Sequence, residues 1–131
     1  MKKKIIITGG LGYIGTELCK LYSGVSWHHK ITVIDNRFIS ERVNQIRNWN
    51  MEFIQGDILD KNLIKKYCTD ADVVHHLAGV TAVPRTKSES SQTQDEKIKE
   101  VGEKGTQNIL EVISDKCKII FPSTHVVYEG I

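Results

Sequence analysis

The chain has 131 residues, a length that suits a single domain with its own hydrophobic core. Apolar residues make up 40% of it and charged residues 26%, as in a soluble globular protein. The net charge of +2 is too small to indicate a nucleic acid or a membrane as partner, and no apolar run is long enough to cross a bilayer. The cysteines, which are odd in number and widely spaced, favour reduced thiols in the cytoplasm and show no metal-ligand pairing.

Strand and helix patterns alternate along the whole chain. Apolar and β-branched runs predict strands at residues 4–8, 31–35, 52–55, 72–75 and 118–122. Apolar residues at helical spacing predict helices at residues 13–23, at 40–47 with Ser40 as N-cap, at 60–67 capped by Asp60, and at 95–114. The polar segment 81–94 is rich in Ser and Thr and predicts a mobile loop.

Such alternation predicts an α/β fold, an open, doubly wound parallel sheet with helices on both faces. We expect a Rossmann-type strand order of 3-2-1-4-5, with the ligand crevice at the carboxyl ends of the strands. Residues 1–131 would form one domain, with no internal repeat and no second domain.

A glycine-rich turn joins the first predicted strand to the first helix, in the run Thr-Gly-Gly-Leu-Gly-Tyr-Ile-Gly over residues 8–15. Glycine adopts the backbone angles of a tight turn cheaply and lets an anion approach the main chain. The first N–H groups of a helix are unpaired and carry partial positive charge. The turn therefore predicts a pyrophosphate site formed by the main chain of Gly9, Gly12, Tyr13, Ile14 and Gly15.

Asp35 ends the second predicted strand, 20 residues after Gly15. An acidic side chain at this place accepts hydrogen bonds from the ribose hydroxyls of the adenosine half, and it repels the 2′-phosphate of NADP. This pattern favours NAD. Arg37 leaves NADP open, because a nearby arginine can hold the extra phosphate, and Asp35 could instead simply cap a turn.

The spacing of the glycines resembles the TGxxGxxG pattern of the extended short-chain dehydrogenase/reductase superfamily, and more narrowly its NAD-dependent nucleotide-sugar epimerase/dehydratase family. Further segments resemble the motifs of that family in the right order. They are Gly56-Asp57-Ile58, His76-Leu77-Ala78-Gly79, Gly105-Thr106-Gln107-Asn108, and residues 123–128. The resemblance covers nearly the whole chain.

The resemblance implies roles for individual residues. Asp57 and Ile58 would face the adenine, Asn36 would bind the cofactor beside Asp35, and residues 77–79 (Leu77, Ala78 and Gly79) would line the cofactor. Thr124 would be the catalytic hydroxyl, which holds the sugar oxygen that becomes a ketone. Thr124 could instead only close the turn after the last strand. His75 and His76 could suggest a metal, but no third ligand is apparent, so we expect no metal site.

The chain departs from the family at several positions. Gly102 stands where the family usually has Asn, and His125 and Val126 stand where dehydratases carry an Asp-Glu pair. A dehydratase is therefore disfavoured relative to an epimerase or a ketoreductase. No tyrosine has a lysine four residues later, whereas the family's Tyr-x-x-x-Lys lies further along the chain. We expect the amino-terminal part of a longer protein, truncated before the last strands and the substrate domain, and inactive by itself.

The main hypothesis is the cofactor-binding part of an NAD-dependent nucleotide-sugar epimerase, similar to 4-epimerases, or of a related sugar oxidoreductase. The alternatives are an NAD(P)-binding redox sensor without catalysis and an NADP-dependent carbonyl reductase of the same superfamily. The resemblance also implies a homodimer through the helix at 95–114.

Overall fold

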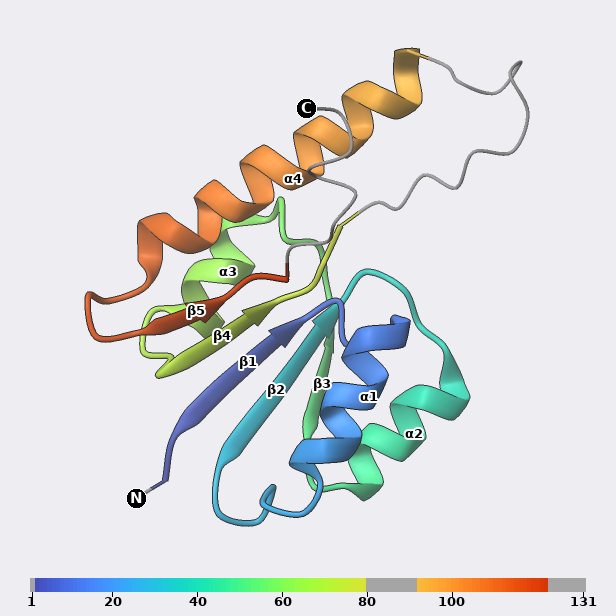
Figure 1. Cartoon of the computed structure of the whole chain (residues 1–131), viewed down its shortest axis with the longest axis vertical. Helices are drawn as coiled ribbons and strands as arrows, with labels where there is room; N and C mark the ends of the chain where they lie inside the picture. Colours follow the sequence, from blue (N-terminus) through green and yellow to red (C-terminus); the bar gives the residue numbers. More distant parts are fainter. Residues whose placement is uncertain (1, 80–91, 123–131) are drawn as a thin grey trace.

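The structure is a computed structural model that describes residues 2–79 and 92–122, with the backbone alone for residues 92–101. Its centre is a parallel sheet of five strands in the order β3-β2-β1-β4-β5 (Figure 1). The strands are β1 (Lys4–Thr8), β2 (Lys30–Asp35), β3 (Glu52–Gln55), β4 (Val73–His76) and β5 (Lys118–Ile120). The predicted fold class and strand order are confirmed.

The register of the sheet brings the carboxyl ends of four strands to one edge. Thr8 at the end of β1 pairs with Ile34 of β2 on one side and with His76 of β4 on the other. Asp35, the next residue of β2, pairs with Gln55 at the end of β3. The residues that follow these positions therefore meet at one edge of the sheet.

Helices cover both faces of the sheet (Figure 1). The helices α1 (Tyr13–Tyr22) and α2 (Ser40–Asn48) enclose one apolar core, and α3 (Lys61–Cys68) and α4 (Gln92–Val112) enclose the other. Because successive side chains of a strand point to opposite faces, Ile5 and Ile7 of β1 belong to the first core and Ile6 to the second. The amino-terminal end of α4 extends beyond the sheet (Figure 1).

Most predicted element bounds lie within a few residues of those observed. Asp60 is the N-cap of α3, as predicted, and its carboxylate accepts hydrogen bonds from the N–H groups of Asn62 and Leu63. The prediction for Ser40 was wrong. The N-cap of α2 is Ile39, with extended backbone and no side-chain cap, and Ser40 is already the first helical residue. Residues 92–94 of the predicted loop belong to α4, and residues 80–91 lie outside the described part of the chain.

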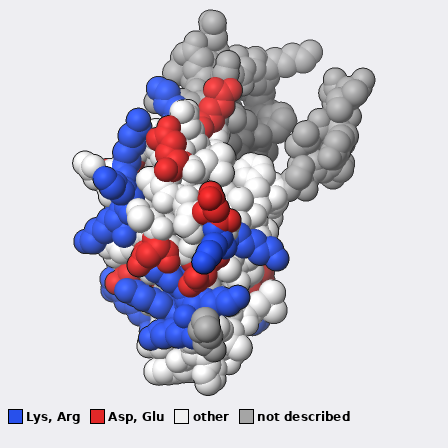
Figure 2. Space-filling view, turned by 90° about the vertical axis from the view of Figure 1, so that its left-hand side faces the viewer, with Lys and Arg blue, Asp and Glu red and all other residues white. Residues whose placement is uncertain are grey.

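Charges of both signs share the surface. Figure 2 shows one side of the molecule, where Lys and Arg side chains are abundant and Asp and Glu side chains lie between them. At the amino end of β1, Lys4 pairs with Asp70 through its ammonium group, and its main-chain N–H donates to Asp72 at 2.8 Å. Among the described residues, no helix is long and apolar enough to cross a membrane.

Candidate dinucleotide site

The glycine-rich turn between β1 and α1 has close backbone contacts that exclude larger residues at two positions. Gly9 has a φ of +70°, and a Cβ atom there would lie 2.7 Å from the main-chain nitrogen of Ala78. A Cβ on Gly15 would lie 2.6 Å from the Cα of Gly10. Gly9 thus lets the turn touch the segment after β4, and Gly15 lets α1 pack against the turn.

Gly12 is different, because a Cβ atom at this position would have room. A Cβ there would have its nearest neighbour, the carbonyl oxygen of Gly9, at 3.4 Å. Gly12 is the N-cap of α1 and supplies no side chain to the free N–H groups of the first turn. The next two side chains, Tyr13 and Ile14, are 89% and 61% exposed. The main chain at this helix start is therefore accessible to an anion.

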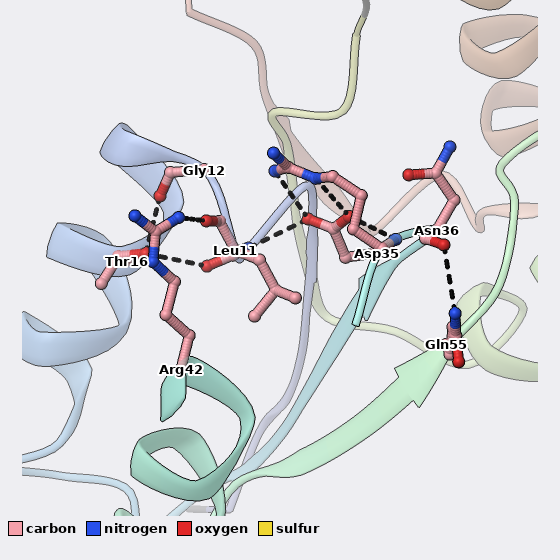
Figure 3. A network of polar contacts seen from close by, with 9 residues as sticks. Leu11, Gly12, Thr16, Asp35, Asn36, Arg42 and Gln55 are labelled. Atoms are coloured by element: carbon pink, nitrogen blue, oxygen red, sulfur yellow. Dashed lines mark hydrogen bonds and ion pairs between the residues drawn. The ribbon is translucent and has the colours of Figure 1, made fainter. Parts of the chain in front are cut away.

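Asp35 is 5% exposed, and its carboxylate holds the glycine-rich turn to the end of β2 (Figure 3). Its Oδ2 accepts a hydrogen bond from the N–H of Leu11 at 3.0 Å, and its Oδ1 accepts one from the N–H of Arg37 at 3.0 Å. The Arg37 guanidinium folds back onto the same group, with Nε 3.3 Å from Oδ1 and a terminal nitrogen 3.4 Å from Oδ2. The turn is also held from α2, because Arg42 donates to the carbonyl of Leu11.

The segments after β2 and β3 supply the predicted adenosine side. The Asn36 carbonyl accepts a hydrogen bond from Gln55 Nε2 at 3.3 Å, which ties the two strand ends together (Figure 3). Asp57 is exposed, and its Oδ1 accepts from the N–H of Leu59 at 2.9 Å. Ile58 is buried, and its carbonyl accepts from Asn108 Nδ2 of α4 at 2.9 Å. Any contact of Ile58 with a ligand would therefore be through its main chain.

A buried hydrogen-bond network ties the turn to the segment after β4. Thr8 Oγ1 accepts from the N–H groups of Leu77 and Ala78, both at 3.1 Å, and lies 2.8 Å from His76 Nδ1. A hydroxyl oxygen has two lone pairs, which these two N–H groups use, so the hydroxyl donates to Nδ1. His76 is then protonated at Nε2, which donates to Thr106 Oγ1 of α4 at 3.0 Å.

Burial lowers the pKa of His76, in agreement with a neutral ring. The sequence interpretation assigned no role to Thr8, His76 or Thr106 in this network. Thr8 and His76 are 68 residues apart, so only the sheet brings them together. His76 and Thr106 do lie in segments that resemble motifs of the family, but those segments were identified for other reasons.

His75 points to the opposite face of the sheet from His76. Its Nε2 lies 2.7 Å from the hydroxyl of Tyr22 in α1, and the two rings meet edge to face. Burial lowers the pKa of His75 as well. Among the described residues, no group of three His, Cys, Asp or Glu side chains could hold a metal ion.

The structure thus brings the predicted cofactor residues of four segments to the carboxyl edge of the sheet. Gly9 meets Ala78, Leu11 binds Asp35, and the Asn36 segment is tied to Gln55. Gly79 is exposed at the end of the described segment after β4. The proposed catalytic Thr124 lies outside the described residues, as do His125 and Val126.

A parallel sheet in this order, with a glycine-rich turn after β1 and an acidic residue at the end of β2, defines a Rossmann-type protein of the extended short-chain dehydrogenase/reductase superfamily. The profile of the 3-beta hydroxysteroid dehydrogenase/isomerase family matches residues 6–129, so the chain belongs to this family.

The relatives that the chain resembles act on nucleotide sugars. UDP-N-acetyl-alpha-D-glucosaminuronate decarboxylase of Bacillus cytotoxicus is 35% identical over 98% of this chain and 38% of that protein. The solved UDP-N-acetylglucosamine 4-epimerase of Methanobrevibacter ruminantium has a TM-score of 0.72 and 29% identity, over 98% of this chain and 40% of that one. The UDP-glucose-4-epimerase of Stenotrophomonas maltophila, solved with NAD, has a TM-score of 0.75 and 23% identity, over 96% and 38%. The chain thus spans about two fifths of their length.

Proposed function

We propose that the chain is the cofactor-binding part of an NAD-dependent nucleotide-sugar epimerase, similar to 4-epimerases, or of a related sugar oxidoreductase. The observation that carries the proposal is the bond between Asp35 and the N–H of Leu11, which places a carboxylate beside the open main chain of the glycine-rich turn. The relatives supply the substrate class, because they act on or bind UDP-linked sugars.

In this proposal the described residues bind and orient the cofactor. The main chain at Gly12, Tyr13 and Ile14 receives the pyrophosphate, and Asp35 receives the ribose. Asp57 and the main chain of Ile58 border the adenine, and residues 77–79 line the nicotinamide side. Bound NAD supplies reversible hydride transfer at a sugar carbon.

Residues beyond the described part complete the proposal. Thr124 holds the reacting sugar oxygen, because a hydroxyl can both donate and accept a hydrogen bond. A Tyr-x-x-x-Lys motif after residue 131 would supply the proton relay and the substrate domain would follow it. A longer sequence without that motif would contradict an epimerase and favour a redox sensor.

Oligomerisation is part of the proposal as well. Leu110 is 52% exposed on α4, and it is the large apolar side chain that the described part of this helix presents to solvent. It supports the predicted homodimer through residues 95–114. Localisation in the cytoplasm stays a prediction.

The first test is calorimetric titration of the chain with NAD, beside Asp35→Ala. Asp115→Ala is the matched control, because Asp115 is exposed and precedes the amino end of β5, at the opposite edge of the sheet. We expect NAD binding that Asp35→Ala abolishes and Asp115→Ala leaves unchanged. A folded chain that binds no NAD, or an Asp35→Ala variant that binds as well as the wild type, would contradict the proposal.

One observation favours a second function, an NADP-dependent reductase of the same superfamily. The exposed guanidinium of Arg37 lies beside the carboxylate proposed to bind ribose, so a cation is available for a 2′-phosphate. Titration with NADP beside NAD separates the two functions.

A further inference from the structure

The Asp35 carboxylate has no acceptor position left for a ribose. An ionised carboxylate offers about four lone-pair positions on its two oxygens. The N–H groups of Leu11 and Arg37 use one on each oxygen, and the Arg37 guanidinium uses one more on each (Figure 3). A ribose that binds Asp35 must therefore displace two of these donors.

The two main-chain donors belong to the fold. The N–H of Leu11 fixes the glycine-rich turn to β2, and the N–H of Arg37 closes the turn directly after Asp35. The guanidinium bonds are longer, at 3.3 and 3.4 Å, and the Arg37 side chain is 55% exposed. Because these bonds are the longer ones and the guanidinium is on the solvent side of the pair, the guanidinium is the donor pair that yields.

The displaced guanidinium would stay close to the cofactor. A terminal nitrogen of Arg37 lies 3.8 Å from the position of a Cβ on Gly12, so the side chain already reaches across the glycine-rich turn. A guanidinium that leaves Asp35 then lies next to the ribose hydroxyls that replaced it. Beside the 2′-hydroxyl of NAD the guanidinium has no anion to pair with. Beside NADP it would neutralise the 2′-phosphate.

We propose that Arg37 is an internal competitor for the ribose site on Asp35, so that its guanidinium must leave the carboxylate before the ribose of the cofactor can bind. Arg42 differs from Arg37 because its guanidinium is bound to the carbonyl of Leu11, where it supports the turn. The inference rests on the proposed function, since it assumes that Asp35 binds the ribose.

The test is calorimetric titration of the wild type and of Arg37→Gln with NAD and with NADP. Loss of the competitor should tighten NAD binding by about two- to fivefold, in the range of a weak ion pair with one partner in solvent. Loss of the cation should weaken NADP binding by about tenfold at low salt, and by less at high salt. Opposite changes for the two cofactors are a signature that general loss of structure cannot produce.

Arg37→Lys and Arg47→Gln complete the experiment. Lysine keeps the charge but lacks the forked donors, so Arg37→Lys should retain NADP binding and bind NAD more tightly than the wild type. Arg47 is exposed on α2, and Arg47→Gln removes the same charge without a change in the ratio of the two affinities.

The outcomes distinguish failure of the competition by Arg37 from failure of the ribose site on Asp35. If Asp35→Ala abolishes NAD binding but Arg37→Gln weakens NAD binding, or moves both cofactors in the same direction, the competition is wrong and the proposed function stands. If Asp35→Ala leaves NAD binding unchanged, the ribose site itself is wrong, and the inference falls with it.

Discussion

His76 connects to Thr8 across the sheet, with its Nδ1 2.8 Å from the threonine hydroxyl, and this pair joins the turn after β1 to the segment after β4. The same Thr8 oxygen holds the N–H groups of Leu77 and Ala78. The other nitrogen of His76 reaches Thr106 of α4. The two segments proposed to hold the cofactor and the helix behind them are therefore positioned by one buried ring.

Replacement of Thr106 by valine should destabilise the protein by about 1 kcal/mol. The side chain keeps its shape, but the Nε2–H of His76 loses its acceptor, and a buried donor without a partner costs about 1–3 kcal/mol. The lower end applies because Thr106 is half-buried. Urea unfolding measures the change. Thr106→Ser keeps the hydroxyl as the control, and equal stability of the two variants would show that the hydrogen bond contributes nothing.

Stability should fall as the pH is lowered from 7.5 to 5.5. Burial lowers the pKa of His75 and His76 below 6.5, the ordinary value, which the unfolded chain keeps. Between the lowered and the ordinary pKa the unfolded state binds more protons, so the free energy of unfolding decreases as the pH falls through this window. The stability that the two neutral rings contribute is fully present above the ordinary pKa of histidine.

The variant His76→Gln isolates the contribution of one ring. It removes one titrating group that is buried in the folded state, so the slope of unfolding free energy against pH should become smaller than in the wild type. Urea unfolding at several pH values gives both slopes. An unchanged slope in His76→Gln would mean that His76 takes up its proton equally in both states.

The sheet could be predicted from the sequence because its strands carry their own signal. The β-branched run at residues 4–8 and the short segment at 52–55, with Phe53 and Ile54 at its centre, gave the bounds of β1 and β3 without error. Local chemistry also sufficed for Asp60, whose carboxylate bonds to N–H groups two and three residues ahead. It failed for Ser40, because the N-cap of α2 is Ile39, one residue earlier, and Ser40 is already helical.

The site could be predicted only in part. The glycine pattern and the position of Asp35 follow from their spacing along the chain, and the structure brings these residues together. The network of Thr8, His76 and Thr106 could not be predicted, because its members come from three elements far apart in sequence. Nor could the fold-back of Arg37 onto Asp35, since a rotamer choice leaves no trace in sequence.

The glycines of the turn should separate folding from cofactor binding. In Gly15→Ala the added methyl group meets the backbone of Gly9 and Gly10, which cannot move aside, so both stability and NAD affinity should fall.

In Gly12→Ala the nearest atom is 3.4 Å away, and the methyl group stands on the surface proposed for the pyrophosphate. We expect stability within about 1 kcal/mol of the wild type, because glycine is only a modest N-cap, and NAD affinity lower by about tenfold or more. Urea unfolding and calorimetry measure the two effects, and undiminished NAD binding in Gly12→Ala would place the pyrophosphate elsewhere.

Two glycines of α4 that are three residues apart should respond in opposite directions to alanine. Gly102 is exposed with no atom within 4 Å of its added Cβ, so Gly102→Ala should stabilise the protein by up to about 1 kcal/mol through helix propensity. Gly105 is buried, and its Cβ would lie 2.7 Å from Cγ1 of Ile58. Gly105→Ala should therefore be destabilising, because overpacking costs about 1–3 kcal/mol and offsets the gain in propensity.

A double-mutant cycle tests whether Ile58 is the cause. In Ile58→Ala the space beside α4 is open, so adding Gly105→Ala should be less harmful there than in the wild type. Urea unfolding of the four proteins gives the interaction energy. Additive effects would show that the penalty at Gly105 arises from another contact, and that α4 does not need a glycine to pack over the segment proposed to border the adenine.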